Sequence, residues 1–175
     1  MPILAAVIAI PGAAYFWMHR ARNAAEMTQE LGGMASDVMS AARRFGFRRR
    51  HDQHPVDSLE DSHVAIAGAA LAFLEIGGLP TREQHDALNR SLQSHLGIPM
   101  KSAEEALILG RWLINECGGA SAALTRLSKR LSKLDRNSFE PLMAVMKDVA
   151  AHAGGDLTDL QRDALAEIAR VFRIG

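Results

Sequence analysis

The feature that most constrains the fold is a stretch beginning at His152 that echoes another stretch 77 positions earlier. The later copy reads H-A-G-G-D-L-T-D-L-Q-R-D-A-L, and the earlier one, from Glu75, reads E-I-G-G-L-P-T-R-E-Q-H-D-A-L. They share a Gly-Gly pair, a Thr, a Gln three residues later and Asp-Ala-Leu. Because internal repeats indicate reuse of one structural unit, the sequence predicts a duplicated helix–turn–helix element.

Each copy combines a helix stop with a helix start. Glycine adopts backbone conformations that end a helix, so each Gly-Gly pair is expected to close the preceding helix. Thr81 and Thr158 are typical N-cap residues, and Gln84 and Gln161 stand where a capping box needs its second side chain. This capping chemistry by itself accounts for most of the repeated pattern.

The rest of the C-terminal part also has helical periodicity. Hydrophobic residues make up 48% of the chain and aromatic residues only 5%, and the many Ala, Leu and Met residues favour helices. The pattern predicts helices over 64–76, 81–96, 102–117, 121–134, 137–153 and 158–172. We therefore expect an all-α, internally duplicated helical bundle of about six helices over residues 62–175.

The N-terminus has the pattern of a membrane anchor. Residues 2–18 carry no charge, and Arg20 and Arg22 follow closely. The run would cover roughly 25 Å of a hydrocarbon core about 30 Å thick, with Trp17 at the interface and a kink at Pro11. Residues 1–20 are thus predicted to cross a membrane once, leaving the C-terminal domain cytoplasmic. The alternative is an N-terminal core helix in a soluble protein.

Residues 21–61 are interpreted as a basic juxtamembrane segment and linker. Five arginines surround Phe45 and Phe47, a composition that favours contact with anionic lipid. The alternative is a solvated flank of the anchor. Residues 51–63 hold three histidines and four acids without zinc-site spacing, and a polar linker is expected there. The predicted lipid-contacting residues are Trp17, Arg20, Arg22, Arg43, Arg44, Arg48, Arg49 and Arg50.

Charge and cysteine content narrow the partners. The net charge is zero, but residues 1–50 are basic and the remainder is mildly acidic without a basic helix carrying interleaved aromatics. Nucleic acid is therefore not expected as a partner, whereas membrane lipids and an unidentified protein are. Ala5, Ala9 and Ala13 form a stripe of small residues that allows a homodimer. The single cysteine, Cys117, agrees with a reducing compartment and is expected to be buried.

Several of these stretches together resemble the bacterial TerB-like family. The resemblance rests on His54-Pro55-Val56-Asp57, the apolar helix before Gly77-Gly78, the Thr/Gln corners and the final Q-R-D-A-L-A-E-I-A-R. The family includes tellurite-resistance proteins and the N-terminal region of a membrane-anchored DnaJ-like co-chaperone, and it implies a duplicated all-helical fold. His54-Pro55 continues with Val56 and not with the aspartate of a J domain, so stimulation of a chaperone ATPase is not implied.

The resemblance also bears on metal binding, because carboxylates at the corners are associated with metal in some members of the family. Here Gly77 and Gly154 stand at the aspartate position, and Gln84 and Gln161 stand at the later glutamate. The acids that remain at the second corner are Asp156, Asp159 and Asp163. They are the candidate ligands of a weak divalent-cation site, and no other cofactor is expected.

The motifs of common enzymes are missing from the sequence. It contains no glycine-rich phosphate loop, nucleophile elbow or paired metal-ligand helix, so we do not expect an enzyme. The leading hypothesis is a membrane-anchored interaction or adaptor module, with envelope or tellurite and metal-oxyanion stress as a setting. A divalent-cation-responsive sensor is the alternative, and a small hydrolase-like enzyme would need catalytic groups that converge only in the fold.

Overall fold

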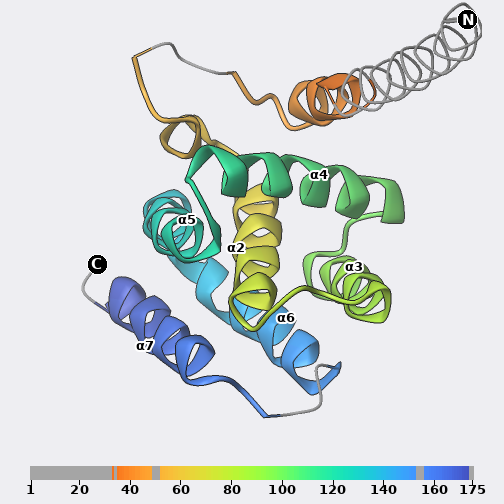
Figure 1. The fold of residues 1–175 in the computed structure, drawn as a ribbon. Helices are drawn as coiled ribbons and strands as arrows, with labels where there is room; N and C mark the ends of the chain where they lie inside the picture. The colour runs from red at the N-terminus through yellow and green to blue at the C-terminus, as the bar shows by residue number, and fades with distance from the viewer. Residues whose placement is uncertain (1–32, 34, 49–51, 153–155, 174–175) are drawn as a thin grey trace, which may run out of the picture. The chain divides into compact units, whose positions relative to one another are not determined.

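The computed structural model describes residues 33, 35–48, 52–152 and 156–173. The chain separates into two compact units, Met1–Asp37 and Val38–Gly175. All regular structure in the described residues is helical, which confirms the all-α prediction (Figure 1). The elements are η1 (Pro55–Ser58), α2 (Ser62–Ile76), α3 (Arg82–Leu96), α4 (Met100–Glu116), α5 (Ala120–Leu134), η2 (Arg136–Ser138), α6 (Phe139–His152) and α7 (Asp159–Arg173).

Helix α2 is the centre of the second unit. Every residue from Val64 to Leu74 is buried, and α2 contacts α3, α4, α5, α6 and α7 (Figure 1). A helix surrounded in this way must be apolar on all sides, and the sequence of α2 is. The other helices each turn one apolar stripe towards the core around α2, so their opposite faces remain available for polar side chains.

Glycines set the distance between α2 and α4. A Cβ placed on Gly110 would lie 2.8 Å from the Cα of Gly68, closer than side-chain carbons approach backbone atoms. The two helices therefore touch backbone to backbone at this crossing. Either glycine would cost helix stability in isolation, and the close packing offsets that cost.

The second unit begins earlier than the sequence predicts. Residues 35–44 are helical, Ala41 is buried, and Phe47 packs edge-on against Trp112 with ring centroids 5.6 Å apart. Arg44 forms an ion pair with Glu105 of α4. Part of the predicted juxtamembrane segment therefore packs on the helical domain.

The predicted polar linker also differs from the structure. Pro55, Val56, Ser58 and Leu59 are buried, and η1 contacts α4 and α5. Three apolar residues among many polar ones are enough to hold a single turn against the core, since burying a side chain such as that of Val56 or Leu59 contributes roughly 1.5–3 kcal/mol. The sequence predicts a linker here because most residues of the stretch are polar.

Helix α4 starts two residues before its predicted start, whereas α6 starts at Phe139, within two residues of its own. Helix α4 begins at Met100, after Pro99, and has no side-chain cap, although its predicted range opens on Ser102, a typical N-cap residue. Before α6, the carboxylate of Asp135 caps η2, because it accepts hydrogen bonds from the Asn137 N–H at 2.9 Å and the Ser138 hydroxyl at 3.1 Å. Proline fixes a backbone angle suited to a helix entry, which lets α4 start without a side-chain cap.

The helix starts at the two repeated corners form as predicted. At the start of α3, the Thr81 hydroxyl accepts from the Gln84 N–H at 3.3 Å, and the Gln84 side chain accepts from the Thr81 N–H at 2.8 Å. At the start of α7, Thr158 and Gln161 make the same pair of bonds, at 3.2 and 3.1 Å. Both corners are capping boxes.

Within the described residues, no helix combines the length and hydrophobicity needed to cross a membrane. The predicted anchor, residues 1–20, lies outside them. It stays a prediction.

Candidate functional site

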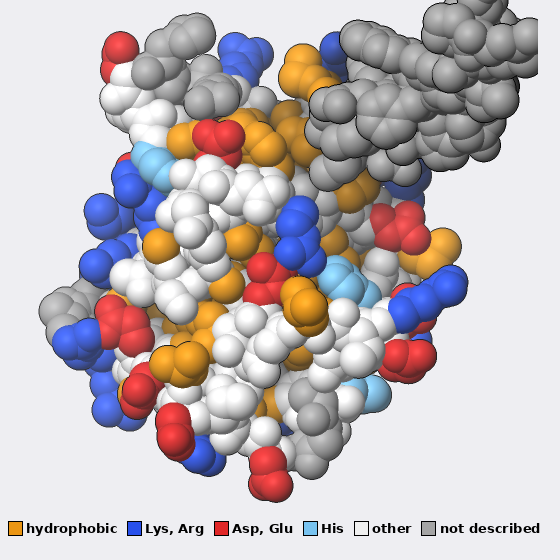
Figure 2. Space-filling model, viewed as in Figure 1, with side chains coloured by type: hydrophobic (Ala, Val, Ile, Leu, Met, Phe, Trp, Pro, Cys, Tyr) orange, Lys and Arg blue, Asp and Glu red, His pale blue; other side chains and the backbone are white. Residues whose placement is uncertain are grey.

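One face of α5 gathers positive charge. Leu124, Leu127 and Leu131 are buried on the side of α5 that faces the core. Four basic residues stand on the remaining sides at positions i, i+3, i+4 and i+7, and we call them the α5 basic face: Arg126, Lys129, Arg130 and Lys133. Figure 2 shows Lys and Arg side chains along the edge of the molecule where Figure 1 places α5. Residues at this spacing share one side of a helix.

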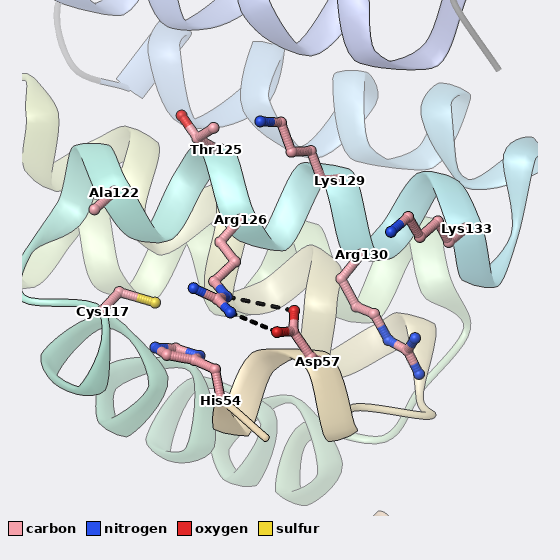
Figure 3. A pocket seen from close by; sticks show the side chains of 9 residues that line it. All are labelled: His54, Asp57, Cys117, Ala122, Thr125, Arg126, Lys129, Arg130 and Lys133. Atoms are coloured by element: carbon pink, nitrogen blue, oxygen red, sulfur yellow. Dashed lines mark hydrogen bonds and ion pairs between the residues drawn. The ribbon is translucent and has the colours of Figure 1, made fainter. Parts of the chain in front are cut away.

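A hollow of about 570 Å³ lies between this face and η1. Figure 3 shows α5 on one side, with the turn carrying His54 and Asp57 on the other and Cys117 at one end. Ala122 and Thr125 complete the lining. The hollow therefore brings together residues that lie about 70 positions apart in the sequence, as the Arg126–Asp57 separation of 69 shows.

The only acidic side chain lining the hollow, among the described residues, is already paired. Arg126 donates to both carboxylate oxygens of Asp57, from Nε at 3.3 Å and from Nη2 at 2.5 Å. The hydrogen bond from Arg126 lowers the pKa of Asp57, which keeps this carboxylate ionised at neutral pH. Both side chains are nearly half exposed, so the pair contributes at most about 1 kcal/mol to stability. Its main effect is to fix the position of Arg126.

The other three cations of the face have no carboxylate partner in an ion pair within the described part of the chain. Arg130 donates from Nε to the backbone oxygen of Leu59 at 2.7 Å, a neutral acceptor. Lys129 and Lys133 are exposed. Like charges one turn apart on a helix destabilise it by about 0.2–0.5 kcal/mol per pair, so this arrangement is not explained by helix stability.

A second hollow, of about 900 Å³, lies on the other side of the same lysines. It adds Arg136 and Arg170 to the lining. Arg170 pairs with Glu167 on its own helix, and the Asp135 carboxylate is occupied by the cap of η2. Lys129 and Lys133 thus form a ridge with a hollow and further arginines on each side.

His54 and Cys117 have structural roles at the end of the first hollow. The His54 Nδ1 accepts the Val56 N–H at 3.3 Å, so its Nε2 carries the proton that faces the Glu116 backbone oxygen at 3.3 Å. This neutral ring links η1 to the end of α4. Burial raises the pKa of the half-buried Cys117 thiol, which disfavours the thiolate needed for nucleophilic chemistry.

A second group of polar residues joins α3 to α6. The Ser91 hydroxyl and His95 Nε2 each lie 2.8 Å from the same oxygen of Asp148. These hydrogen bonds lower the pKa of the Asp148 carboxyl, and the one from Ser91 has the larger effect. Serine and histidine both bond to the aspartate and not to each other, so histidine is not placed to activate the hydroxyl. This group holds two helices together.

Two further histidines also make structural contacts. His85 Nε2 lies 3.5 Å from Arg111, which is itself paired with Glu75. The pKa of His85 is lowered, mainly by burial and also by the charge of Arg111. His152 Nδ1 donates to the Asp148 backbone oxygen at 2.8 Å within α6. Each ring is used within the helical framework.

The candidate metal ligands lie at the start of α7. Asp156, Asp159 and Asp163 are all exposed, and Asp159 pairs with Arg162 at 2.6 Å. No three His, Cys, Asp or Glu side chains of the described residues are gathered in a way that suits a metal ion. The divalent-cation site stays a prediction.

The predicted lipid contacts are described only in part. Arg43 and Arg48 are exposed, whereas Arg44 is engaged by Glu105. The remaining members of that set lie outside the described residues: Trp17, Arg20, Arg22, Arg49 and Arg50.

The sequence carries a signal for the α5 basic face, although the same signal is typical of any solvated helix surface. The signal is the i, i+3, i+4, i+7 spacing of its cations. What the sequence could not reveal is the position of η1, because that turn lies in a stretch predicted as linker. Comparisons with protein-family models, with curated proteins and with solved structures gave no match.

Proposed function

We propose that this protein is a non-enzymatic interaction module that binds an acidic partner through the α5 basic face. The observation that carries the proposal is the exposed row of cations on α5, in which Lys129 and Lys133 have no ion pair within the described residues. Complementary charge speeds encounter with an acidic partner and selects against basic ones. A surface that opposes its own helix stability is more reasonably explained by binding than by folding.

The proposal includes the setting predicted from the sequence. Residues 1–20 would hold the domain at the cytoplasmic side of a bacterial inner membrane, where the resemblance to TerB-like proteins suggests envelope or metal-oxyanion stress. Carbonate extraction tests the anchor, because the full-length chain should remain in the membrane pellet. A chain lacking residues 1–20 should move to the soluble fraction, and release of the full-length chain would contradict the anchor.

Binding is tested by site-specific crosslinking of the full-length chain in membranes. A photo-crosslinking amino acid in place of Ala122, an exposed lining residue of the first hollow, should form a discrete adduct. K129E/K133E should reduce the adduct at least tenfold. The matched control K101E/K147E, which changes two exposed lysines on α4 and α6 by the same charge, should stay within twofold. Equal adducts in the two double variants would overturn the proposal.

A further inference from the structure

We infer that the α5 basic face binds a phosphate group, carried as a doubly charged phosphomonoester. This inference rests on the proposed function and specifies the chemistry that the face recognises. Three features support it: cations without a carboxylate partner in the described residues, the spacing of Lys129 and Lys133, and the hollows beside these lysines.

The unbalanced charge is larger than one carboxylate supplies. Arg126 already has a carboxylate partner in Asp57. Lys129 and Lys133 have no partner among the described residues, and the bond from Arg130 goes to a neutral carbonyl. A phosphomonoester carries a charge of about −1.5 to −2 at neutral pH and offers three strong acceptor oxygens. It therefore matches two or three neighbouring cations better than a single carboxylate does.

The lysines are spaced to share one such group. They stand four residues apart on α5, a rise of about 6 Å, and in Figure 3 the Lys133 side chain runs back along the helix in the direction of Arg130. Lysine binds phosphate as a mobile point charge, so two ammonium groups can approach one phosphate from different sides. Thr125 in the first hollow adds a hydroxyl donor.

The ridge position leaves room for the group that carries the phosphate. Lys129 and Lys133 line both hollows, of about 570 and 900 Å³, and Arg136 borders the second one. Arg136 is exposed and makes no ion pair within the described residues. A phosphate seated on the ridge would thus meet a further arginine on the η2 side, while its organic part occupies a hollow.

The test measures protection of individual lysines from acetylation, read by quantitative mass spectrometry. It uses the full-length chain in phosphatidylcholine nanodiscs at constant ionic strength. Methyl phosphate should protect Lys129 and Lys133 saturably and at least threefold, and should leave Lys101 and Lys147 within 1.5-fold of their unprotected rates, as site-specific binding requires. Absent protection, or equal protection of all four lysines, would overturn the inference.

Two competing ligands test the chemical class. Dimethyl phosphate has a single negative charge and should need at least tenfold higher concentration for the same protection. Tetraglutamate offers carboxylates in place of phosphate and should also need a higher concentration than methyl phosphate. Equal protection by tetraglutamate would mean that the face selects acidic peptides, and the phosphate inference would fall.

An arginine variant tests the site without altering its reporters. R136Q should raise the methyl phosphate concentration for half-protection at least threefold, because it removes one bordering charge. R90Q, an exposed arginine of α3, is the matched control and should have no effect. If the two variants behave alike, Arg136 does not border the bound phosphate.

Nanodiscs of different lipid composition show whether the phosphate belongs to a lipid headgroup or to a soluble ligand. Nanodiscs containing phosphatidic acid, which carries a phosphomonoester, are compared with discs containing phosphatidylglycerol, which carries a phosphodiester. Protection by phosphatidic acid alone identifies a lipid headgroup, and protection by methyl phosphate alone identifies a soluble ligand. If neither protects while the K129E/K133E crosslink is still lost, the interaction module stands and only the phosphate assignment fails.

Discussion

The two Thr–Gln corners share one motif but use their glutamines differently. At α3, Gln84 is only half-buried and bonds to the backbone of its own cap. At α7, Gln161 is only 5% exposed and bonds to the cap in the same way. Its Nε2 also donates to the backbone oxygen of Phe73 in the last turn of α2, at 3.2 Å.

The difference lies in what covers each glutamine. A Cβ on Gly77, just after α2, would lie 2.5 Å from Gln161 Nε2. The amide of Gln161 therefore caps the start of α7 and the end of α2 at once, with the bare backbone of Gly77 beside it. The motif thus specifies a local cap, whereas the link between repeats depends on where neighbouring helices end.

Removing the two glutamines should have the largest and most unequal effect. Q161A leaves the Phe73 carbonyl without this buried donor and opens a small cavity, so the free energy of unfolding should fall by about 2–3 kcal/mol. Q84A removes a partly exposed half of a cap and should cost about 0.5 kcal/mol. Denaturant unfolding of the full-length chain in micelles measures both. Equal losses would mean that the bond to Phe73 contributes nothing.

Adding a methyl group at Gly77 tests the contact from the other side. G77A should cost about 1–3 kcal/mol, because the new carbon overlaps the held amide of Gln161. In the Q161A background the same change should cost only a few tenths of a kcal/mol, giving a coupling of about 1 kcal/mol or more. Additive effects in this double-mutant cycle would rule out the overlap as the cause.

The two threonines should be equivalent. T81A and T158A each remove an N-cap hydroxyl, and each should reduce the free energy of unfolding by about 1 kcal/mol. T81S and T158S retain the acceptor and serve as controls near the wild-type value. A difference of more than about 1 kcal/mol between the two alanine variants would show that even the local caps differ.

The smallest expected difference between the two corners is in how the stability of their helix starts depends on pH. The pKa of Glu83 is lowered from 4.5, mainly by a hydrogen bond from its own backbone N–H and to a smaller extent by a hydrogen bond from the Thr81 side chain. Because the folded pKa lies below the unfolded one, this stabilisation is present above pH 4.5 and is lost as pH falls through the folded value. Leu160 stands at the matching place in α7, so no such change is expected there.

Hydrogen exchange of the first-turn amides between pH 3 and 6 measures this difference. Protection should fall at the start of α3 on acidification, because Glu83 is protonated. It should change less at the start of α7, where Leu160 takes that place and the first-turn acid, Asp159, pairs with Arg162 and not with the cap. E83Q should remove the pH dependence at α3. A change of the same size at both corners would point to a global effect of acid.

The sequence predicted the bundle well because its signals are local. Helix α3 has its predicted end, and α2, α5 and α7 differ from the prediction by at most two residues at each boundary, since Gly-Gly pairs and threonine caps act within one turn. The start of α4 at Met100 is also within two residues of the prediction, but it follows a proline and lacks a side-chain cap. The buried turn around Val56 was missed, because it depends on long-range contacts with α4 and α5.

The candidate site divides in the same way. The spacing of Arg126, Lys129, Arg130 and Lys133 on one side of a helix can be derived from the sequence alone. The sequence alone does not show which of these cations lack a carboxylate partner in the described residues. The group bonded to Arg126, Asp57, lies 69 positions away, and the group bonded to Arg130, the Leu59 carbonyl, lies 71 positions away. The hollows beside the lysines likewise exist only once η1, η2 and α7 are in place.

Hydrophobic periodicity and capping act between residues close along the chain, so the amino-acid sequence alone predicts an all-helical chain with two equivalent corners. The folded protein is needed to show that Gln161 links two helices while Gln84 does not. It is also needed to show that Arg126 is paired, while Lys129 and Lys133 are exposed without an ion pair in the described residues. Both outcomes depend on contacts between residues far apart along the chain, and local sequence patterns do not specify those contacts.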